Sequence, residues 1–568
     1  MNEEIRKLIK EKGLLIEKEV FDLMQSFPDA KSAKDFLEGL ERFLGQKIIT
    51  KSTLNKNIEY VQNIVSKLGD NKEEMQRVFV KFGISLEVRK EQSIQNLEEG
   101  ELAVTMTNEV ASGANGRVEE SKEKAGGKEE AKSLGYKIFY ADTKTDKKLA
   151  VEDFTGNFRA RYQFLQRILM QRADLQNLAS IGKISNDRQS LSIIGIVKDK
   201  RITKNKNVII TFEDLTGEIS VLVRSEKEEL FRKANELILD EVVAVRASGS
   251  RDMLFANEIY FPDAFVQEKM RFDQEINVAF LSDVHCGGKK HLGKSFERFL
   301  EWLNSEDENA RKIKFIFFVG DNVDGVGIFP GQEKLLELGS MKEQYALLAY
   351  YLKKVPKYIT MFMCPGQHDA VRVAEPQPLI DRKYASALYE IENLVLVTNP
   401  TLVKLIEKDK EFKILMYHGA SIHEIINEIP ELRESKAHKT PAKAVKHLLK
   451  RRHLAPTHSA FVYIPNLGKD PLVINEVPDV LCTGEVHRLD IENYNGVLII
   501  TGSCWQGQTD FEEKVGNIPD PGKVPVLNLK TRELKIFDFG IEEEITSMEK
   551  IENVIIKQQD EEEEEVQA

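Results

Sequence analysis

The chain has 568 residues, of which 41% are hydrophobic and 31% charged, a composition typical of a globular protein with about three or four domains. No apolar run approaches the roughly 18 residues of a membrane span, and no apolar segment follows Met1, so we expect neither membrane insertion nor secretion. Four cysteines without a C-x-x-C pair disfavour a disulfide framework and a zinc knuckle. These features together predict an intracellular, cytoplasmic protein.

The first 150 residues divide into a helical part and a linker. Apolar residues recur at helical spacings on both sides of Pro28, which predicts an α-helical N-terminal module over residues 1–75. Residues 88–150 are expected to form a flexible charged linker, because the stretch from Ala111 to Gly135 has almost no large apolar residues.

Residues 151–270 predict one helix followed by an OB-fold β-barrel. An amphipathic helix is expected from Phe154 to Leu169, and apolar strands follow it, with one helix between the third and fourth strand. The strands are expected at residues 192–197, 207–212, 218–223, 241–247 and 254–260. OB barrels bind single strands or protein partners. Aromatic residues are sparse here, which favours a protein-contact or spacer barrel and leaves both alternatives open.

Residues 273–540 predict a layered α/β domain, because short apolar strands alternate with helical segments. The net charge of the chain is −12, and residues 541–568 hold 11 Asp/Glu and only 2 Lys. We expect this acidic tail to be disordered and solvated, with docking to a basic partner as the alternative.

Five strand ends in the α/β domain carry side chains that bind metal ions. These are Asp283 and His285, Asp321, the segment 367–369, His418, and Glu485 and His487. Residues i and i+2 share a face if strand geometry continues into the loop, so the D-x-H and E-x-H pairs are each expected to face one centre. Imidazole with carboxylate suits Mn, Fe, Zn or Ni, and a carboxylate such as Asp321 can bridge two ions about 3.5–4 Å apart.

The order of these motifs resembles the calcineurin-like metallophosphoesterases. Longer strings resemble more specifically the family of small, exonuclease subunits of archaeal family-D DNA polymerases. They are Gly320 to Gln332 (GDNVDGVGIFPGQ), Pro365 to Pro378 (PGQHDAVRVAEPQP) and His453 to His458 (HLAPTH). The resemblance implies a multidomain protein with a helical N-terminal module, an OB-fold barrel and a C-terminal α/β-sandwich phosphoesterase domain.

The resemblance also implies the function and the role of each site residue. It implies a nucleoid-associated 3′–5′ exonuclease that proofreads single-stranded DNA 3′ ends for a separate large catalytic polymerase subunit. One divalent ion is expected on Asp283, His285, Asp321 and His487. The second is expected on Asp321, Gln367, His418 and Glu485. His368 is expected to protonate the leaving oxygen or stabilise the phosphorane, with Asp369 orienting its ring.

Two residues depart from the family pattern at the second ion. Gln367 stands where the family usually has Asn, and Glu485 stands where it usually has His. Both keep a ligand atom and make the site harder and more negative, which favours Mn²⁺ or Mg²⁺ over softer ions. We expect two divalent ions, with Mn²⁺ first and Mg²⁺, Zn²⁺ or Fe²⁺ as alternatives. The alternative is a catalytically weakened or inactive scaffold subunit of the polymerase. A stand-alone phosphoesterase for small molecules is disfavoured, because such an enzyme would need neither the OB barrel nor the helical N-terminal module.

Several residues near these motifs have two interpretations each. Arg372 is predicted either to contact a substrate phosphate or to brace its loop through a salt bridge. Trp505 is expected in the core, with base stacking as the alternative. The basic run from Lys446 to Arg452 is expected either to guide DNA to the site or to form a solvated helix face.

Overall fold

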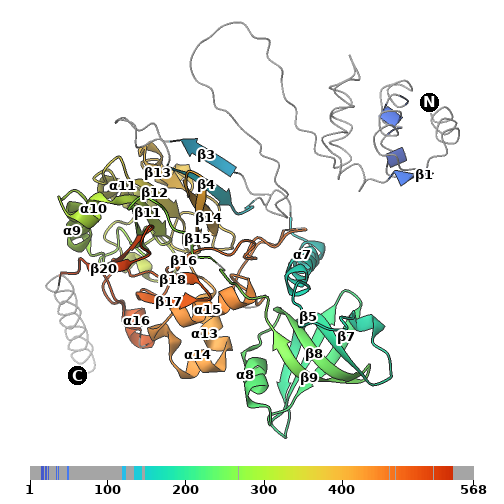
Figure 1. Ribbon diagram of the computed structural model, residues 1–568. Coiled ribbons are helices and arrows are strands. Elements are labelled where there is room, and N and C mark those ends of the chain that lie inside the picture. Colours follow the sequence, from blue (N-terminus) through green and yellow to red (C-terminus); the bar gives the residue numbers. More distant parts are fainter. Residues whose placement is uncertain are drawn as a thin grey trace, which may run out of the picture. The chain divides into compact units, whose positions relative to one another are not determined.

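The computed structural model describes residues 118–122, 134–143, 148–266, 268–458, 461–466, 468–515 and 517–541, together with scattered residues between 15 and 49. The chain divides into two compact units, Met1–Asn108 and Glu109–Ala568. The second unit contains a closed barrel and a larger domain built on two sheets (Figure 1). Among the described residues, no helix is long and apolar enough to cross a bilayer.

The barrel confirms the five strands expected between residues 189 and 260. Its strands are β5 (Gln189–Ile202), β6 (Val208–Asp214), β7 (Gly217–Val223), β8 (Val242–Ser250) and β9 (Met253–Tyr260), with helix α8 (Glu228–Glu236) between β7 and β8. They close in the order β5-β6-β7-β9-β8. Alternate residues of β6 and β7, such as Ile210 and Val221, fill the interior, since successive side chains of a strand point to opposite faces. The predicted amphipathic helix is α7 (Val151–Leu169), and a 3-10 turn, Ile181–Lys183, precedes the barrel.

The larger domain contains two mixed sheets. The six-stranded sheet has the order β13 (Leu394–Leu396), β12 (Thr360–Cys364), β11 (Ile313–Val319), β10 (Asn277–Leu281), β19 (Lys523–Asn528), β20 (Leu534–Asp538). The seven-stranded sheet has the order β17 (Asp490–Tyr494), β18 (Val497–Thr501), β16 (Val480–Thr483), β15 (Lys410–Met416), β14 (Thr401–Glu407), β4 (Leu134–Tyr140), β3 (Val118–Lys122). Strands β10, β11 and β12 are parallel to one another, as are β15, β16 and β18.

Three apolar cores show that the two sheets pack face to face between helices. Val278 and Phe280 of β10 lie with Ile414 of β15 in the core between the sheets, whereas Ala279 and Leu281 of β10 lie in the core under the first helices. The helices on the side of the six-stranded sheet are α9 (Gly293–Leu303), α10 (Glu308–Arg311), α11 (Met341–Leu352) and α12 (Arg382–Ala385). Those on the other side are α13 (Ile422–Glu428), α14 (Pro430–Glu434) and α15 (Ala442–Arg451) (Figure 1). The predicted layered α/β domain is thereby confirmed.

The linker prediction for residues 88–150 is wrong at its C-terminal end. Residues 134–140 form β4, which pairs with β14 over seven residues, and Ile138 is fully buried between the sheets. Only a short apolar stretch marks this strand in the sequence, and its partner lies more than 260 residues away, so local composition concealed it. Strand β3 (Val118–Lys122) pairs with β4 and also lies in the predicted linker.

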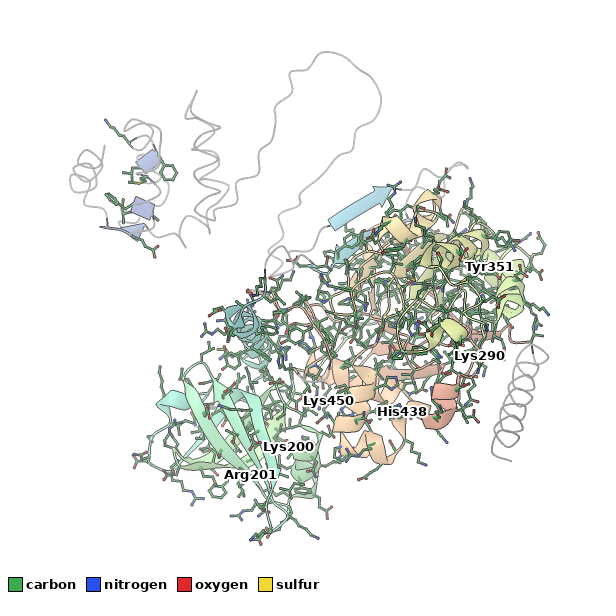
Figure 2. The ribbon with its side chains drawn as sticks, turned by 180° about the vertical axis from the view of Figure 1, so that it is seen from behind. Lys200, Arg201, Lys290, Tyr351, His438 and Lys450 are labelled. Atoms are coloured by element: carbon green, nitrogen blue, oxygen red, sulfur yellow. The ribbon has the colours of Figure 1, made fainter. Side chains whose placement is uncertain are left out.

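The basic run in α15 joins the barrel to the two-sheet domain. Arg451 is 1% exposed and its Nε lies 2.6 Å from Glu241 Oε2, just before β8. Lys450, which is labelled in Figure 2, pairs with Glu236 at the end of α8. Arg452 donates to the carbonyls of Ile474 and Asn475. Both predictions for this run are therefore wrong for Arg451 and Arg452, because buried carboxylate and carbonyl partners hold them inside the protein.

The ends of the chain are described only in small part. Most of the predicted helical module over 1–75 and most of the acidic tail over 541–568 lie outside the described residues. Within the first unit, β1 (Leu15–Ile16) pairs in parallel with β2 (Ile48–Ile49), which the helical prediction did not include.

Candidate metal centre

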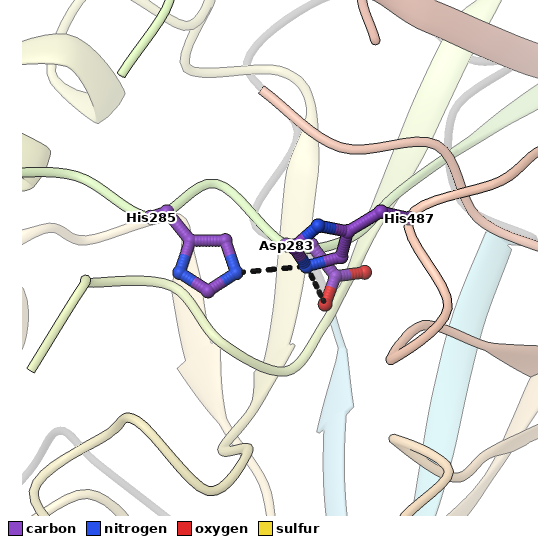
Figure 3. Close-up of side chains that lie close together, drawn as sticks. All are labelled: Asp283, His285 and His487. Atoms are coloured by element: carbon purple, nitrogen blue, oxygen red, sulfur yellow. Dashed lines mark hydrogen bonds and ion pairs between the residues drawn. The ribbon is translucent and has the colours of Figure 1, made fainter. Parts of the chain in front are cut away.

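Three of the predicted ligands form a first group after β10 and β16. Asp283, His285 and His487 place one ligand atom each within 4.8 Å of the others (Figure 3). The Nε2 atoms of His285 and His487 are 3.0 Å apart, and His487 Nε2 is 3.6 Å from Asp283 Oδ1. Two imidazole nitrogens and a carboxylate oxygen therefore converge on one point.

A second group lies around His418, after β15. Its Nε2 is 3.3 Å from Asp321 Oδ2 and 3.3 Å from Glu485 Oε2. Gln367 Nε2 donates to the same Glu485 oxygen at 2.8 Å. All four predicted ligands of a second ion are therefore neighbours.

The two groups form one centre. Ligand atoms of Asp283, Asp321 and His418 also lie within 4.8 Å of one another, so Asp283 and Asp321 connect the groups. The reason is topological: β10, β11 and β12 are parallel, and their carboxyl ends, which carry Asp283, Asp321 and Gln367, meet at one edge of the sheet. The structure therefore brings together all seven predicted metal ligands.

The backbone at five of these ligands is left-handed. Strand geometry therefore does not continue into the loops, and the expectation that residues i and i+2 share a face for that reason is wrong. The φ angles are 50° at Asp283, 47° at His285, 46° at Asp321, 74° at Glu485 and 57° at His487. Such angles are uncommon for residues other than glycine and concentrate at functional sites. The two residues of the E-x-H pair belong to different groups, Glu485 to the second and His487 to the first, whereas Asp283 and His285 share the first group.

Two close approaches explain the glycines beside the ligands. A Cβ on Gly366 would lie 2.2 Å from Asp321 Oδ1, and a Cβ on Gly320 would lie 2.1 Å from His418 Nδ1. Any larger residue at these positions would displace a ligand.

The outer nitrogens of the ligand histidines have partners that the sequence analysis missed. His487 Nδ1 is 3.0 Å from Glu512 Oε1, in helix α16 (Asp510–Val515), and His418 Nδ1 is 3.0 Å from the carbonyl oxygen of Val319. His285 Nδ1 lies 3.3 Å from Asp324 Oδ1. Such contacts orient an imidazole toward a metal. Asp324 could have been found from its place in the GDNVDG string, whereas nothing in the sequence marks Glu512.

His368 lies at the centre, but Asp369 does not orient it as expected. His368 Nδ1 is 2.6 Å from the carbonyl oxygen of Asp324, and its Nε2 is 3.9 Å from Asp321 Oδ2. The buried Asp369 carboxylate instead accepts hydrogen bonds from Asn322, Gly366 and Tyr345. The predicted orienting role of Asp369 is therefore wrong, because these donors occupy its carboxylate. Asp369 instead braces the loop that carries Gln367 and His368.

Burial and mutual charge shift the pKa values at the centre in opposite directions. Burial raises the pKa of Asp283. Burial alone would also raise the pKa of Asp321, but His418 and His368 outweigh it and hold that pKa well below its usual range. Burial opposes protonation of His487, yet Glu512 and Asp283 raise its pKa to about 9. Likewise, His418 outweighs burial and lowers the pKa of Glu485 to about 2. The centre thus combines the ionised carboxylates of Asp321 and Glu485 with a His487 imidazole that holds a proton, which a cation would displace.

Buried polar atoms without a hydrogen bond support a fit to cations. At this centre they include Asp283 Oδ2, Gln367 Oε1 and His418 Nε2 in the described part of the chain. Natural proteins leave few such atoms, because each costs about 1–3 kcal/mol. Their clustering in one centre, among carboxylate, amide and imidazole ligands, fits divalent cations such as Mn²⁺.

Two other predicted residues have structural partners. The guanidinium of Arg372 donates to the carbonyls of Thr143, Ala374 and Pro376, and these contacts brace its loop. Its contact with a substrate phosphate stays a prediction. Trp505 is 1% exposed and packs edge-on against Phe296 with ring centroids 4.8 Å apart, which confirms its core position.

Comparison with known proteins identifies the family. Residues 278–489 match the family of DNA polymerase alpha/epsilon B subunits. The DNA polymerase II small subunit of Pyrococcus furiosus is 37% identical over 404 residues, which cover 69% of this chain and 64% of the relative. The chain belongs to the family of archaeal DNA polymerase II small subunits. The corresponding protein of Methanothermobacter thermautotrophicus is 38% identical over 69% of this chain and 80% of its own length.

The match leaves part of both chains uncovered. The chain spans just under two thirds of the length of the Pyrococcus furiosus relative. Among solved structures, one described as a novel archaeal phosphodiesterase aligns with 46% of this chain and 99% of its own, at 15% identity and a TM-score of 0.23, which is too low to bear on the fold.

Proposed function

We propose that the chain is the small subunit of a two-subunit replicative DNA polymerase and acts as a metal-dependent 3′–5′ exonuclease on single-stranded DNA ends. The observation that carries this proposal is the clustering of seven ligand side chains around buried polar atoms that lack hydrogen bonds. A calcineurin-like phosphoesterase domain is proposed for the two-sheet domain on the same ground. The large catalytic subunit is the proposed partner.

Two divalent ions, with Mn²⁺ first, would be held by the two groups of ligands. Asp283, His285 and His487 would bind one ion, Gln367, His418 and Glu485 the other, and Asp321 both. When bound, the ions supply a polarised phosphate and an activated water. The carboxylates of Asp283 and Asp321 offset the charge of these ions in a buried place, and Glu512 holds the ring of His487 in its ligating orientation.

His368 is the group placed to move a proton. Its Nδ1 contacts the Asp324 carbonyl, which fixes the ring and leaves Nε2 on the side of Asp321. Burial opposes its protonation, but Asp321 and the Asp324 carbonyl outweigh burial and raise the pKa of His368. A protonated His368 can donate a proton from Nε2 to the leaving 3′ oxygen or hydrogen-bond to the phosphate in the transition state.

A second candidate function is a scaffold subunit without catalysis. The contact between Gln367 Nε2 and Glu485 Oε2 favours it, because it occupies one oxygen of a predicted ligand with an amide donor. Rotation of the amide would instead present Gln367 Oε1 to an ion. The contact therefore weakens the second site for metal binding but leaves all of its ligand atoms in place.

The test is Mn²⁺-dependent degradation of single-stranded DNA labelled at its 5′ end. Wild-type chain should shorten the DNA from its 3′ end, and His368→Ala should abolish shortening while it still binds the large subunit. His458→Ala is the matched control, because His458 contacts Tyr463 outside the centre. If neither wild type nor control degrades DNA with the large subunit present, or if saturating Mn²⁺ binds at one ion per chain, the scaffold function is favoured.

A further inference from the structure

A loop with an apolar tip follows Asp324 at the candidate centre. Residues 326–331 read Val-Gly-Ile-Phe-Pro-Gly and are all exposed. Exposed fractions are 42% for Val326, 38% for Ile328 and 45% for Phe329. Several large apolar side chains exposed on one short segment are a feature of binding surfaces, because isolated exposed residues are common but contiguous ones are not.

The frame of this apolar loop, residues 325–335, is held by two buried glutamines. Gln332 Nε2 donates to the Asp324 carbonyl at 2.8 Å, and its Oε1 accepts from Ile328 N at 2.9 Å. Gln344 Oε1 accepts from Gly325 N at 2.9 Å, and its Nε2 donates to the Gly325 carbonyl at 3.0 Å. Because both amides are buried and doubly bonded, they hold the loop in a shape that keeps its apolar tip in solvent.

The loop adjoins the residue that we propose as the proton donor. The Asp324 carbonyl that accepts from Gln332 also contacts His368 Nδ1 at 2.6 Å. A Cβ placed on Gly325 would lie 2.5 Å from the His368 carbonyl oxygen and 2.9 Å from Ile328 Cδ1. The base of the apolar loop therefore lies directly beside His368.

The charges around the tip suit a nucleic acid strand. The tip itself carries no charged residue. At the C-terminal end of the apolar loop, Lys289 is exposed, and its backbone N–H and Nζ donate to the neutral carbonyls of Leu335 and Lys334. The same end carries the exposed residues Glu333 and Lys334. An uncharged apolar tip matches the apolar faces of bases, and the two lysines match the anionic backbone of a single strand.

We infer that the apolar loop binds the unpaired nucleosides next to the scissile phosphate, with the ring of Phe329 stacked on a base. This inference rests on the proposed exonuclease function. A base inside a duplex is stacked on its neighbours, so Phe329 can bind only a base that has left the duplex. The loop thereby selects unpaired 3′ ends over paired ones.

Binding is measured first, without cleavage. In the His368→Ala chain with Mn²⁺, fluorescence anisotropy of a labelled single-stranded oligonucleotide gives the reference affinity. Adding Phe329→Ala should weaken binding at least about 5-fold, equivalent to about 1 kcal/mol, and Phe329→Trp should restore it. Phe265→Ala is the matched control, because Phe265 is 63% exposed and belongs to the connection between β9 and β10 rather than to the apolar loop. Equal affinities for Phe329→Ala and Phe265→Ala would overturn the inference.

Cleavage separates this inference from the proposed function. With active chains, the rate on single-stranded DNA is divided by the rate on bis(p-nitrophenyl) phosphate, a diester without bases. This ratio should fall at least about 5-fold in Phe329→Ala and stay unchanged in Phe265→Ala. If wild type cleaves neither substrate, the proposed function fails while the anisotropy test still decides the role of the loop. Loss of binding to the large subunit with unchanged DNA affinity would assign the loop to that protein and overturn the inference.

Discussion

Divalent ions should stabilise this chain strongly, and the size of the effect follows from the polar atoms of the centre. Three buried atoms there lack hydrogen bonds, on Asp283, Gln367 and His418. At about 1–3 kcal/mol each, they represent about 3–9 kcal/mol of unfavourable free energy that ligation can relieve. Tight binding of Mn²⁺ is therefore expected from the structure of the site itself.

The measurable shift is set by mass action. At an Mn²⁺ concentration 100 times Kd, binding to the folded state adds about 2.7 kcal/mol to the free energy of unfolding. For a domain of this size, each kcal/mol raises Tm by about 2–4 °C. We therefore expect Tm to rise by about 5–10 °C when EDTA is replaced by saturating Mn²⁺.

The assay is thermal unfolding followed by circular dichroism, with and without Mn²⁺. Asp321→Asn should lose most of the shift, because Asp321 belongs to both groups of ligands. Asp199→Asn, which alters an exposed residue of the barrel, should keep it. An equal shift in wild type and Asp321→Asn would refute the reasoning, since the stabilisation would then arise outside the centre.

Three further predictions concern the framework. The buried Arg161 lies 2.7 Å from Asp470, so Asp470→Ala leaves this cation without its carboxylate partner. Urea unfolding should then show a free energy of unfolding lower by about 3–5 kcal/mol. The control Lys357→Ala removes an exposed ion pair and should lower the free energy of unfolding by less than about 1 kcal/mol. Burial alone would raise the pKa of Asp470, but Arg161 outweighs burial and lowers this pKa below its value in the unfolded chain. The ionised Asp470 therefore stabilises the fold above about pH 4, and this stabilisation is lost as the pH falls further. The free energy of unfolding of Asp470→Asn, measured between about pH 5 and 2, should lack this part of the decline with falling pH. Trp505→Ala should lower the unfolding free energy by about 3–5 kcal/mol, and an unchanged urea midpoint would contradict its core position.

The candidate ligands could be predicted from sequence because each follows an apolar strand directly. Short runs such as Ile313–Val319 have the length and composition of buried strands, and parallel strands end at one edge of a sheet. The barrel was predictable for a similar reason: its strand and helix periods are local properties of the chain. Local periodicity and the order of motifs thus determined the fold class of both parts and the identity of the candidate ligands.

Other features depend on contacts between distant segments, which no local pattern encodes. Glu512 holds His487, β4 completes a sheet beside β14, and Arg451 meets Glu241 inside the protein although its sequence context resembles a solvated helix. The left-handed backbone angles at Glu485 and His487 are likewise imposed only by the packed loops. The sequence by itself determined which side chains can bind ions, because ligand chemistry belongs to each residue. Only the tertiary structure decided which partners orient them and which charges are buried, because those depend on the sum of long-range contacts.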